Sequence, residues 1–213
     1  MLGAIILAGG KGNRIGGDKP LIKLGGKELI LHVYNAVQRI SDEFVVVLNR
    51  SDDIELYERV LPESVVITKD IGGGEGPLIG ACSGLRKTRS EYATILPCDT
   101  PFISIPVLSY LKDSSENFEA AVPRWSNGYT EPLHSIYRVE AAKRACTETI
   151  NEGNMRISGM ISRLRTNYIA VEELRKLDEE LLTFFNVNSQ KDLNKAEKIL
   201  QNRTGLNPSS YKL

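Results

Sequence analysis

The sequence predicts one α/β domain with a mainly parallel sheet, on two observations. Short runs of β-branched and apolar residues alternate along the chain with segments of helical period, as in folds that cross over between parallel strands. The 213 residues suffice for one such domain with a buried core, and two full domains would be cramped. We expect a single domain over residues 1–202, followed by a flexible polar tail over residues 203–213.

Seven segments are expected as strands. The first lies in "MLGAIILAGG", which is apolar for too short a run to span a bilayer and has no basic region before it. It therefore predicts a buried first strand. In chain order, the seven strand segments are "GAIILA", "FVVVL", "SVVIT", "YATIL", "EAAVP", "HSIYRV" and "NYIAV".

Three helices are expected from apolar periodicity. The first carries a stripe at helical spacing (Leu29, Ile30, Val33, Val37 and Ile40), and "VEAAKRACTETI" repeats the pattern later. Near the end, Ser189 followed three residues later by Asp192 resembles a capping box that opens "QKDLNKAEKILQNR". We expect this last helix to close the sheet with three residues inward (Leu193, Ala196 and Leu200).

Composition excludes several classes of function. Lys and Arg total 27 against 27 for Asp and Glu, so a bulk surface for nucleic acid or an acidic membrane is not expected and any anion site must be local. The three cysteines (Cys82, Cys98 and Cys146) form no CxxC pair. This pattern predicts reduced thiols in a cytoplasmic protein rather than a disulfide framework or a zinc cluster.

Four loops are expected to carry the chemistry, because ligands of open α/β sheets bind at the carboxyl ends of the strands. These loops are Gly9 to Lys19, Asp70 to Gly80, Pro97 to Ile103 and Asn186 to Ser189.

The first of these loops, in "LAGGKGNRIGGDKP", combines glycines with three cations. It matches neither the dinucleotide GxGxxG pattern, because Ile15 stands where glycine is needed, nor a P-loop. Glycines let main-chain N–H groups approach an anion, and the spaced charges of Lys11, Arg14 and Lys19 suit a triphosphate better than a single phosphate.

Four motifs together resemble those of the molybdenum cofactor guanylyltransferases, within the nucleotidyltransferase superfamily. "LAGG" with Arg14 and Asp18-Lys19 is similar to the opening signature, and "CDTP" resembles the metal-binding turn. "GPLIG" and "FFNVNSQKDL" are similar to the middle and terminal motifs. The resemblance implies a single Rossmann-like domain with three layers, of the nucleotide-diphospho-sugar transferase type.

The activity that the resemblance implies is transfer of GMP from GTP to the phosphate of molybdenum-molybdopterin, with release of pyrophosphate. Mg²⁺ is the implied cofactor, and proteins that supply the cofactor or receive it are implied as transient partners. A guanylyltransferase for adenosylcobinamide phosphate has an opening similar to "GGKGNRIGGDKPLIKL", although "GPLIG" and "CDTPFIS" favour the molybdenum family. Another sugar-phosphate nucleotidyltransferase and a catalytically silent protein that binds GTP or delivers the cofactor remain as alternatives.

The resemblance also implies roles for individual residues. Lys19, Asp99 and Arg14 are expected in catalysis: Lys19 on phosphate, Arg14 on the β/γ end and Asp99 as the magnesium ligand. The expected nucleotide-binding set is Leu7, Ala8, Gly9, Gly10, Lys11, Arg14, Lys19, Asp70 and Asp99. Asn49 is left out, because "VVVLNR" aligns with a family asparagine only after a shift of one residue.

The second substrate is assigned to three residues. Asn186 and Asn188 in "NVN" match terminal asparagines of the family, and amides can hydrogen-bond a pterin edge or lend an oxygen to magnesium. Arg156 in "GNMRISGM" is expected to hold the pterin phosphate. "Glu131-Pro132-Leu133" falls where the family has a substrate-facing segment, and Cys98 is expected to pack rather than react.

Overall fold

A seven-stranded sheet forms the centre of the molecule. The computed structural model describes residues 1–9, 18–71 and 76–204. The strand order is β5-β4-β1-β6-β8-β7-β9. In chain order the strands are β1 (Leu2–Leu7), β4 (Glu43–Leu48), β5 (Val66–Lys69), β6 (Tyr92–Pro97), β7 (Ala120–Arg124), β8 (Ser135–Arg138) and β9 (Thr166–Ala170). All seven predicted strands are therefore confirmed.

One strand of this sheet runs against the others. β8 pairs antiparallel with both β6 and β7, whereas every other neighbouring pair among the seven strands is parallel. The segment between β7 and β8 is ten residues long (125–134), and its one helical element is a short 3₁₀ turn, η2 (Pro132–His134). Because a parallel crossover usually needs a helix, this short connection returns the chain antiparallel. The predicted mainly parallel sheet is confirmed.

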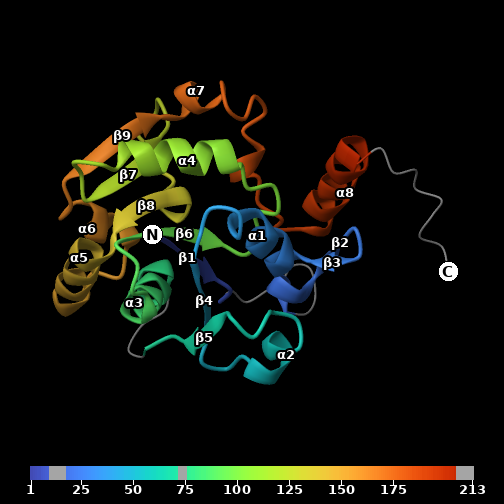
Figure 1. The fold of residues 1–213 in the computed structure, drawn as a ribbon, viewed down its shortest axis with the longest axis horizontal. Helices are drawn as coiled ribbons and strands as arrows, with labels where there is room; N and C mark the ends of the chain where they lie inside the picture. Colours follow the sequence, from blue (N-terminus) through green and yellow to red (C-terminus); the bar gives the residue numbers. More distant parts are fainter. Residues whose placement is uncertain (10–17, 72–75, 205–213) are drawn as a thin grey trace.

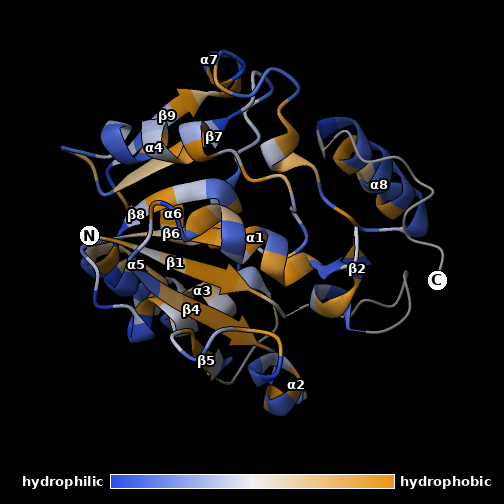
Figure 2. Cartoon of the chain, turned by 45° about the vertical axis from the view of Figure 1, so that its right-hand side comes forward, coloured by the Kyte–Doolittle hydropathy of each residue, from blue (hydrophilic) through white to orange (hydrophobic). Residues whose placement is uncertain are grey.

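Helices cover both faces of the sheet, which gives three layers (Figure 1). On one face the core contains residues of α1 (Leu29–Val37), α2 (Ile54–Glu58), α4 (Ile105–Ser114) and α7 (Val171–Leu174). On the other face it contains residues of α3 (Pro77–Lys87), α5 (Val139–Asn151) and α6 (Ile157–Ile161). Consecutive residues of β1 alternate between the two, since Ile6 belongs to the first core and Ile5 to the second. Figure 2 shows the central strands as a hydrophobic layer between these helices.

The last helix does not close the sheet, which corrects that expectation. α8 (Gln190–Thr204) packs beside a small hairpin of β2 (Lys23–Leu24) and β3 (Lys27–Glu28), at one side of the molecule (Figure 1). A third apolar cluster joins the helix to this hairpin, and it contains all three residues predicted to point inward. The periodicity therefore identified the apolar face of the helix but not the surface that it covers. The predicted capping pair is present, with Ser189 Oγ donating to Asp192 Oδ2 at 2.7 Å.

Two predicted boundaries also differ from the structure. The predicted loop from Asp70 to Gly80 ends inside α3, because Pro77 occupies the first turn of that helix, where its missing N–H costs nothing. α8 reaches Thr204, two residues beyond the predicted end of the domain, and the remainder of the predicted tail lies outside the described residues. No helix within residues 1–9, 18–71 and 76–204 is long and apolar enough to cross a membrane.

We predict that Gly84→Ala destabilises the protein although alanine favours helices. A Cβ at Gly84 would overlap Ile5 Cγ2 and lie 3.1 Å from Val47 Cγ2, so α3 could not approach β1 and β4 as closely. Crowding of this kind costs about 1–3 kcal/mol, against a helix-propensity gain of about 1 kcal/mol. Chemical denaturation measures the free energy of unfolding.

Gly80→Ala in the same helix is the matched control for this prediction. Its Cβ would lie 3.3 Å from Leu7 Cδ2 and 3.4 Å from Asp70 Oδ1, so it requires only small shifts. The two variants should therefore differ, with Gly84→Ala the less stable. Equal stabilities would show that α3 is not held against the sheet as described.

Candidate active site

A cleft of about 1160 Å³ opens at the carboxyl edge of the sheet. It extends from Asp70, after β5, across the ends of β4, β1 and β6 to the connection between β7 and β8. The antiparallel direction of β8 places that connection at this edge, because β8 starts where its neighbours end. Seven of the predicted site residues line the cleft: Leu7, Ala8, Gly9, Lys19, Asp70, Asp99 and Asn186.

Main-chain hydrogen bonds fix the strand ends that form the floor of this cleft. Ala8 N donates to Val47 O at 2.8 Å, and Cys98 N donates to Leu7 O at 3.1 Å. The parallel pairing therefore continues just past β1 and β6 and places Asp99 next to the end of β1. Cys98 itself is buried, and burial raises the pKa of its thiol, which agrees with the predicted packing role.

Lys19 and Asp99 line the cleft and meet Asn188 there through the side chain of Lys19. The Lys19 ammonium forms an ion pair and a hydrogen bond with Asp99 Oδ2 and donates to Asn188 Oδ1 at 2.6 Å. Both charged side chains are mostly buried, with 15% of Lys19 and 13% of Asp99 exposed. Val187 N donates to Asp99 O at 2.9 Å, so the "NVN" turn is attached to the end of β6. The structure thus brings together side chains from three distant parts of the chain.

Asp99 retains an acceptor that can bind a cation. Its Oδ1 is buried and has no hydrogen-bond partner among the described residues. No cluster of three or more His, Cys, Asp or Glu side chains with metal-ligand geometry occurs in the described part of the chain. A divalent cation here would therefore be held by one carboxylate, with phosphate, amide or water oxygens completing its coordination, as is common for magnesium.

Asp70 lies on the β5 side of the cleft. Burial and then the charge of Asp52 raise its pKa, and Arg50 opposes this effect. Its Oδ1 is buried without a hydrogen-bond partner in the described ranges, so it too has an unused acceptor. This carboxyl group is therefore placed to accept from a ligand on that side of the cleft.

The opposite wall consists of the β7–β8 connection. Trp125 Nε1 donates to Glu131 Oε1 at 2.8 Å. His134, in the same connection, is buried, and its Nε2 lies 3.3 Å from Thr100 Oγ1. The Phe184 ring contacts both aromatic groups edge-on, with centroid distances of 5.9 Å to Trp125 and 5.2 Å to His134. This wall therefore combines an apolar support with one partly buried carboxyl group.

Residues 4–166 match the sequence family described as the MobA-like NTP transferase domain. A probable molybdenum cofactor guanylyltransferase of Methanocaldococcus jannaschii is 33% identical over 200 residues, which cover 91% of this chain and 97% of the relative. A molybdenum cofactor guanylyltransferase of Desulfosudis oleivorans is also 33% identical and covers 92% of this chain and 95% of its own. This chain belongs to the MobA-like NTP transferase family.

Solved structures agree with this assignment. The molybdopterin-guanine dinucleotide biosynthesis protein A of Archaeoglobus fulgidus superposes with a TM-score of 0.77 at 30% identity and covers 94% of this chain and 99% of its own. The 4-diphosphocytidyl-2C-methyl-D-erythritol synthase of Anaerococcus prevotii superposes with a TM-score of 0.70 at 14% identity, which shows a shared fold. The predicted fold class and family are confirmed, and this MobA-like transferase is a nucleotidyltransferase.

The remaining predicted site residues of the transferase fall into two groups. Arg156 is exposed at the start of α6 and does not line the cleft, although the next residue, Ile157, does. It is therefore not brought to the centre with Lys19 and Asp99. Gly10, Lys11 and Arg14 lie outside the described residues, so their predicted contacts with phosphate stay predictions.

Several residues of this MobA-like transferase line the cleft without having been predicted. Asn49, which the alignment left out of the predicted site, is among them, and its Oδ1 would lie 2.6 Å from a Cβ at Gly9. The sequence feature that indicates this position is the place of Asn49 directly after the strand segment "VVVL". A shift of one residue in the alignment obscured it. Tyr129 and His134 also line the cleft, and no motif in the sequence indicates their place.

We predict that acid destabilises the transferase through His134. Burial lowers the pKa of this histidine to about 3, whereas an unfolded histidine titrates near 6.5. The unfolded state then binds the extra proton below about pH 6.5, so stability falls as the pH decreases toward 3. Between pH 7 and pH 5, the free energy of unfolding of the wild type should fall by about 2 kcal/mol more than that of His134→Gln.

Urea unfolding at each pH measures this difference in slope. His32→Gln is the control, because burial also lowers the pKa of His32 but that side chain is only partly buried. For His32→Gln, the fall in the free energy of unfolding from pH 7 to pH 5 should match that of the wild type or lie between those of the wild type and His134→Gln. Parallel curves for the wild type and His134→Gln would contradict a neutral buried imidazole.

Proposed function

We propose that this chain transfers GMP from GTP to the phosphate of a molybdopterin-type acceptor and releases pyrophosphate. The observation that carries the proposal is the pairing of Lys19 with Asp99 in the cleft, with Asn188 as a second acceptor of the lysine, in a chain whose relatives are named molybdenum cofactor guanylyltransferases. Those names do not favour the corrinoid alternative. An intact Lys19 and Asp99 likewise argue against a catalytically silent GTP-binding protein.

The reaction requires two anions to meet and negative charge to be neutralised. An oxygen of the acceptor phosphate attacks the α-phosphorus of GTP, a new P–O bond forms, and the bond to the bridging oxygen breaks with its electron pair on pyrophosphate. Mg²⁺ bound at Asp99 would supply charge neutralisation at the transferring phosphate. Lys19 would transfer its hydrogen bonds from Asp99 to phosphate oxygens as the substrate enters. No side-chain nucleophile is needed, because positioning and electrostatics suffice.

The two substrates are proposed to take opposite halves of the cleft. Leu7, Ala8, Gly9 and Asp70 support a nucleotide site over the ends of β1, β4 and β5. Asn186 lines the cleft on the side of the "NVN" turn and supports an acceptor site there. We place the reaction in the cytoplasm, where the three free cysteines would stay reduced, with transient contacts to proteins that supply or receive the cofactor.

The test is an assay of pyrophosphate release from each nucleoside triphosphate with magnesium. Molybdopterin and corrinoid phosphate are supplied in parallel as acceptors, and the nucleotide product is identified by mass spectrometry. We expect turnover with GTP and molybdopterin. Turnover with the corrinoid alone, or with CTP in place of GTP, would refute the proposed reaction.

We predict that Asp99→Asn abolishes turnover while the fold persists. Replacing the carboxylate removes the charge that would bind the cation and should lower kcat by about a hundredfold or more. Circular dichroism and thermal unfolding report the fold. Asp113→Asn on the exposed surface of α4 is the matched control and should behave as the wild type. Near-normal activity of Asp99→Asn in saturating magnesium would contradict the assignment.

We also predict that Asn188 acts through Lys19. Asn188→Ala removes the 2.6 Å acceptor of the ammonium, and a hydrogen bond of this kind contributes about 1 kcal/mol, so kcat should fall about fivefold. A double-mutant cycle with Lys19→Ala tests the mechanism, because Asn188→Ala should have little further effect once the lysine is absent. Additive effects would show that Asn188 acts independently. Asn194→Ala on the exposed face of α8 is the control.

A further inference from the structure

The pair formed by Trp125 and Glu131 has no part in the proposed phosphate chemistry. Trp125 is the single tryptophan of the chain, and its indole N–H donates to Glu131 Oε1 at 2.8 Å. Glu131 lines the cleft, and no described residue donates a hydrogen bond to its second oxygen, Oε2. The carboxyl group of this lining residue therefore keeps an acceptor that a ligand in the cleft could use.

The position of this carboxyl group is fixed through both its side chain and its main chain. Glu131 N donates to Pro123 O at 2.9 Å, and Glu131 O accepts from Ser135 Oγ at 2.7 Å and from His134 N at 3.1 Å. The indole that holds the carboxyl group packs edge-on against Phe184. A ligand would thus meet an acceptor that is already oriented, which favours selective recognition.

Such an acceptor is complementary to a flat heterocycle with adjacent N–H and NH₂ donors. Burial raises the pKa of Glu131, and the indole hydrogen bond partly opposes this effect. Two donors from a ligand would stabilise the charged form further. The 2-amino-4-oxopyrimidine edge supplies these donors, and both a guanine and a pterin carry it. The chemistry of the edge alone does not distinguish the two substrates.

The order of groups along the cleft does distinguish them. The reaction joins two phosphates beside Asp99, so the two ring systems must extend from this point in opposite directions. Asp70, after β5, lies on the side where the nucleotide is placed, and Glu131 lies beyond β6 on the other side. The ring that reaches Glu131 is therefore the ring of the acceptor.

We propose that Glu131, held by Trp125, recognises the 2-amino-4-oxo edge of the acceptor's pterin ring. Glu131 is then a residue that determines acceptor specificity, and Trp125 is a positioning residue. The inference rests on the proposed function for the identity of the acceptor. It concerns a contact that operates without turnover, so binding can test it separately.

The fluorescence of the single tryptophan provides this binding test. Wild type and Glu131→Gln are titrated with pterin and with lumazine, which carries an oxygen in place of the 2-amino group. For the wild type we expect Trp125 emission to change on binding and the Kd for pterin to be about tenfold or more below that for lumazine. Glu131→Gln keeps an oxygen for the indole N–H but should lose this preference, because its amide can donate to lumazine.

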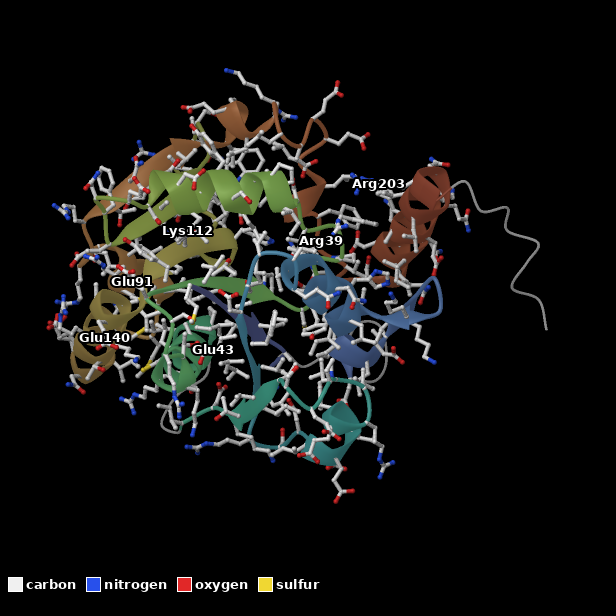
Figure 3. All side chains as sticks on the ribbon, in the orientation of Figure 1. Arg39, Glu43, Glu91, Lys112, Glu140 and Arg203 are labelled. Carbon is white, nitrogen blue, oxygen red and sulfur yellow. The ribbon has the colours of Figure 1, made fainter. Side chains whose placement is uncertain are left out.

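Three results of the titration would overturn the inference. One is an unchanged ratio of pterin to lumazine affinity in Glu131→Gln, and another is the absence of any preference in the wild type. The third is a loss of GTP affinity in Glu131→Gln with pterin affinity intact, which would assign the carboxyl group to the nucleobase. Glu140→Gln, on the outer surface of α5, is the control and should match the wild type (Figure 3).

Steady-state kinetics separate this inference from the proposed function. Glu131→Gln should raise the KM for molybdopterin about tenfold with the KM for GTP unchanged, and Trp125→Phe should raise it about threefold while the ring still packs on Phe184. If the wild type does not transfer GMP to molybdopterin, the proposed function fails whatever the titration shows. If it does, and Glu131→Gln leaves the KM for molybdopterin unchanged, only the recognition by Glu131 fails.

Discussion

The arrangement of this molecule depends on the complete burial of β1. The strand is hydrogen-bonded to β4 on one side and to β6 on the other, and helices cover both of its faces. Its residues can therefore be apolar on both sides, as "LGAIIL" is. Only the carboxyl end of such a strand is open to a ligand. Gly9 and Lys19, at the two ends of the first loop, and Asp99 after β6 consequently face the same space.

The reversed strand β8 makes the two halves of the cleft chemically different. On the β1, β4 and β5 side the wall is built from strand ends, which present main-chain groups and the acid Asp70. On the other side the wall is a ten-residue connection that holds Trp125, Glu131 and His134. Two substrates of different shape can thus be received at one edge of one sheet.

Local patterns in the sequence were enough to identify the seven strands and the family motifs. Short β-branched runs such as "FVVVL" favour buried strands, and Lys19 and Asp99 stand in motifs that resemble those of the family. The predicted site set is largely found in the cleft for this reason. The contact between Lys19 and Asp99 joins positions eighty residues apart, so their spacing in the sequence does not reveal it.

The errors of prediction concern surfaces that only the folded chain defines. The period of α8 specified its apolar face, but the hairpin β2–β3 that covers it consists of two-residue strands, too short to give a pattern. Asn49 was excluded by an alignment shift, although its place after β4 decides that it lines the cleft. His134 belongs to a connection whose position follows from the direction of β8, and strand direction is not encoded in any one segment. Glu131 in the same connection was indicated only by its resemblance to a substrate-facing segment.

The ion pair between Lys19 and Asp99 has a thermodynamic consequence for how ligands associate. A carboxylate that already neutralises an ammonium group is a poor ligand for a bare divalent ion, which would have to bind beside another positive charge. Phosphate oxygens would remove this conflict, because the Lys19 ammonium and the divalent ion could then each bind an anionic oxygen besides Asp99. For the proposed reaction we therefore expect cation and triphosphate to bind cooperatively, and by linkage each would raise the affinity of the other by the same factor. In the proposed mechanism the Lys19 ammonium would compete with the metal for Asp99 until the phosphates of the substrate bind the lysine.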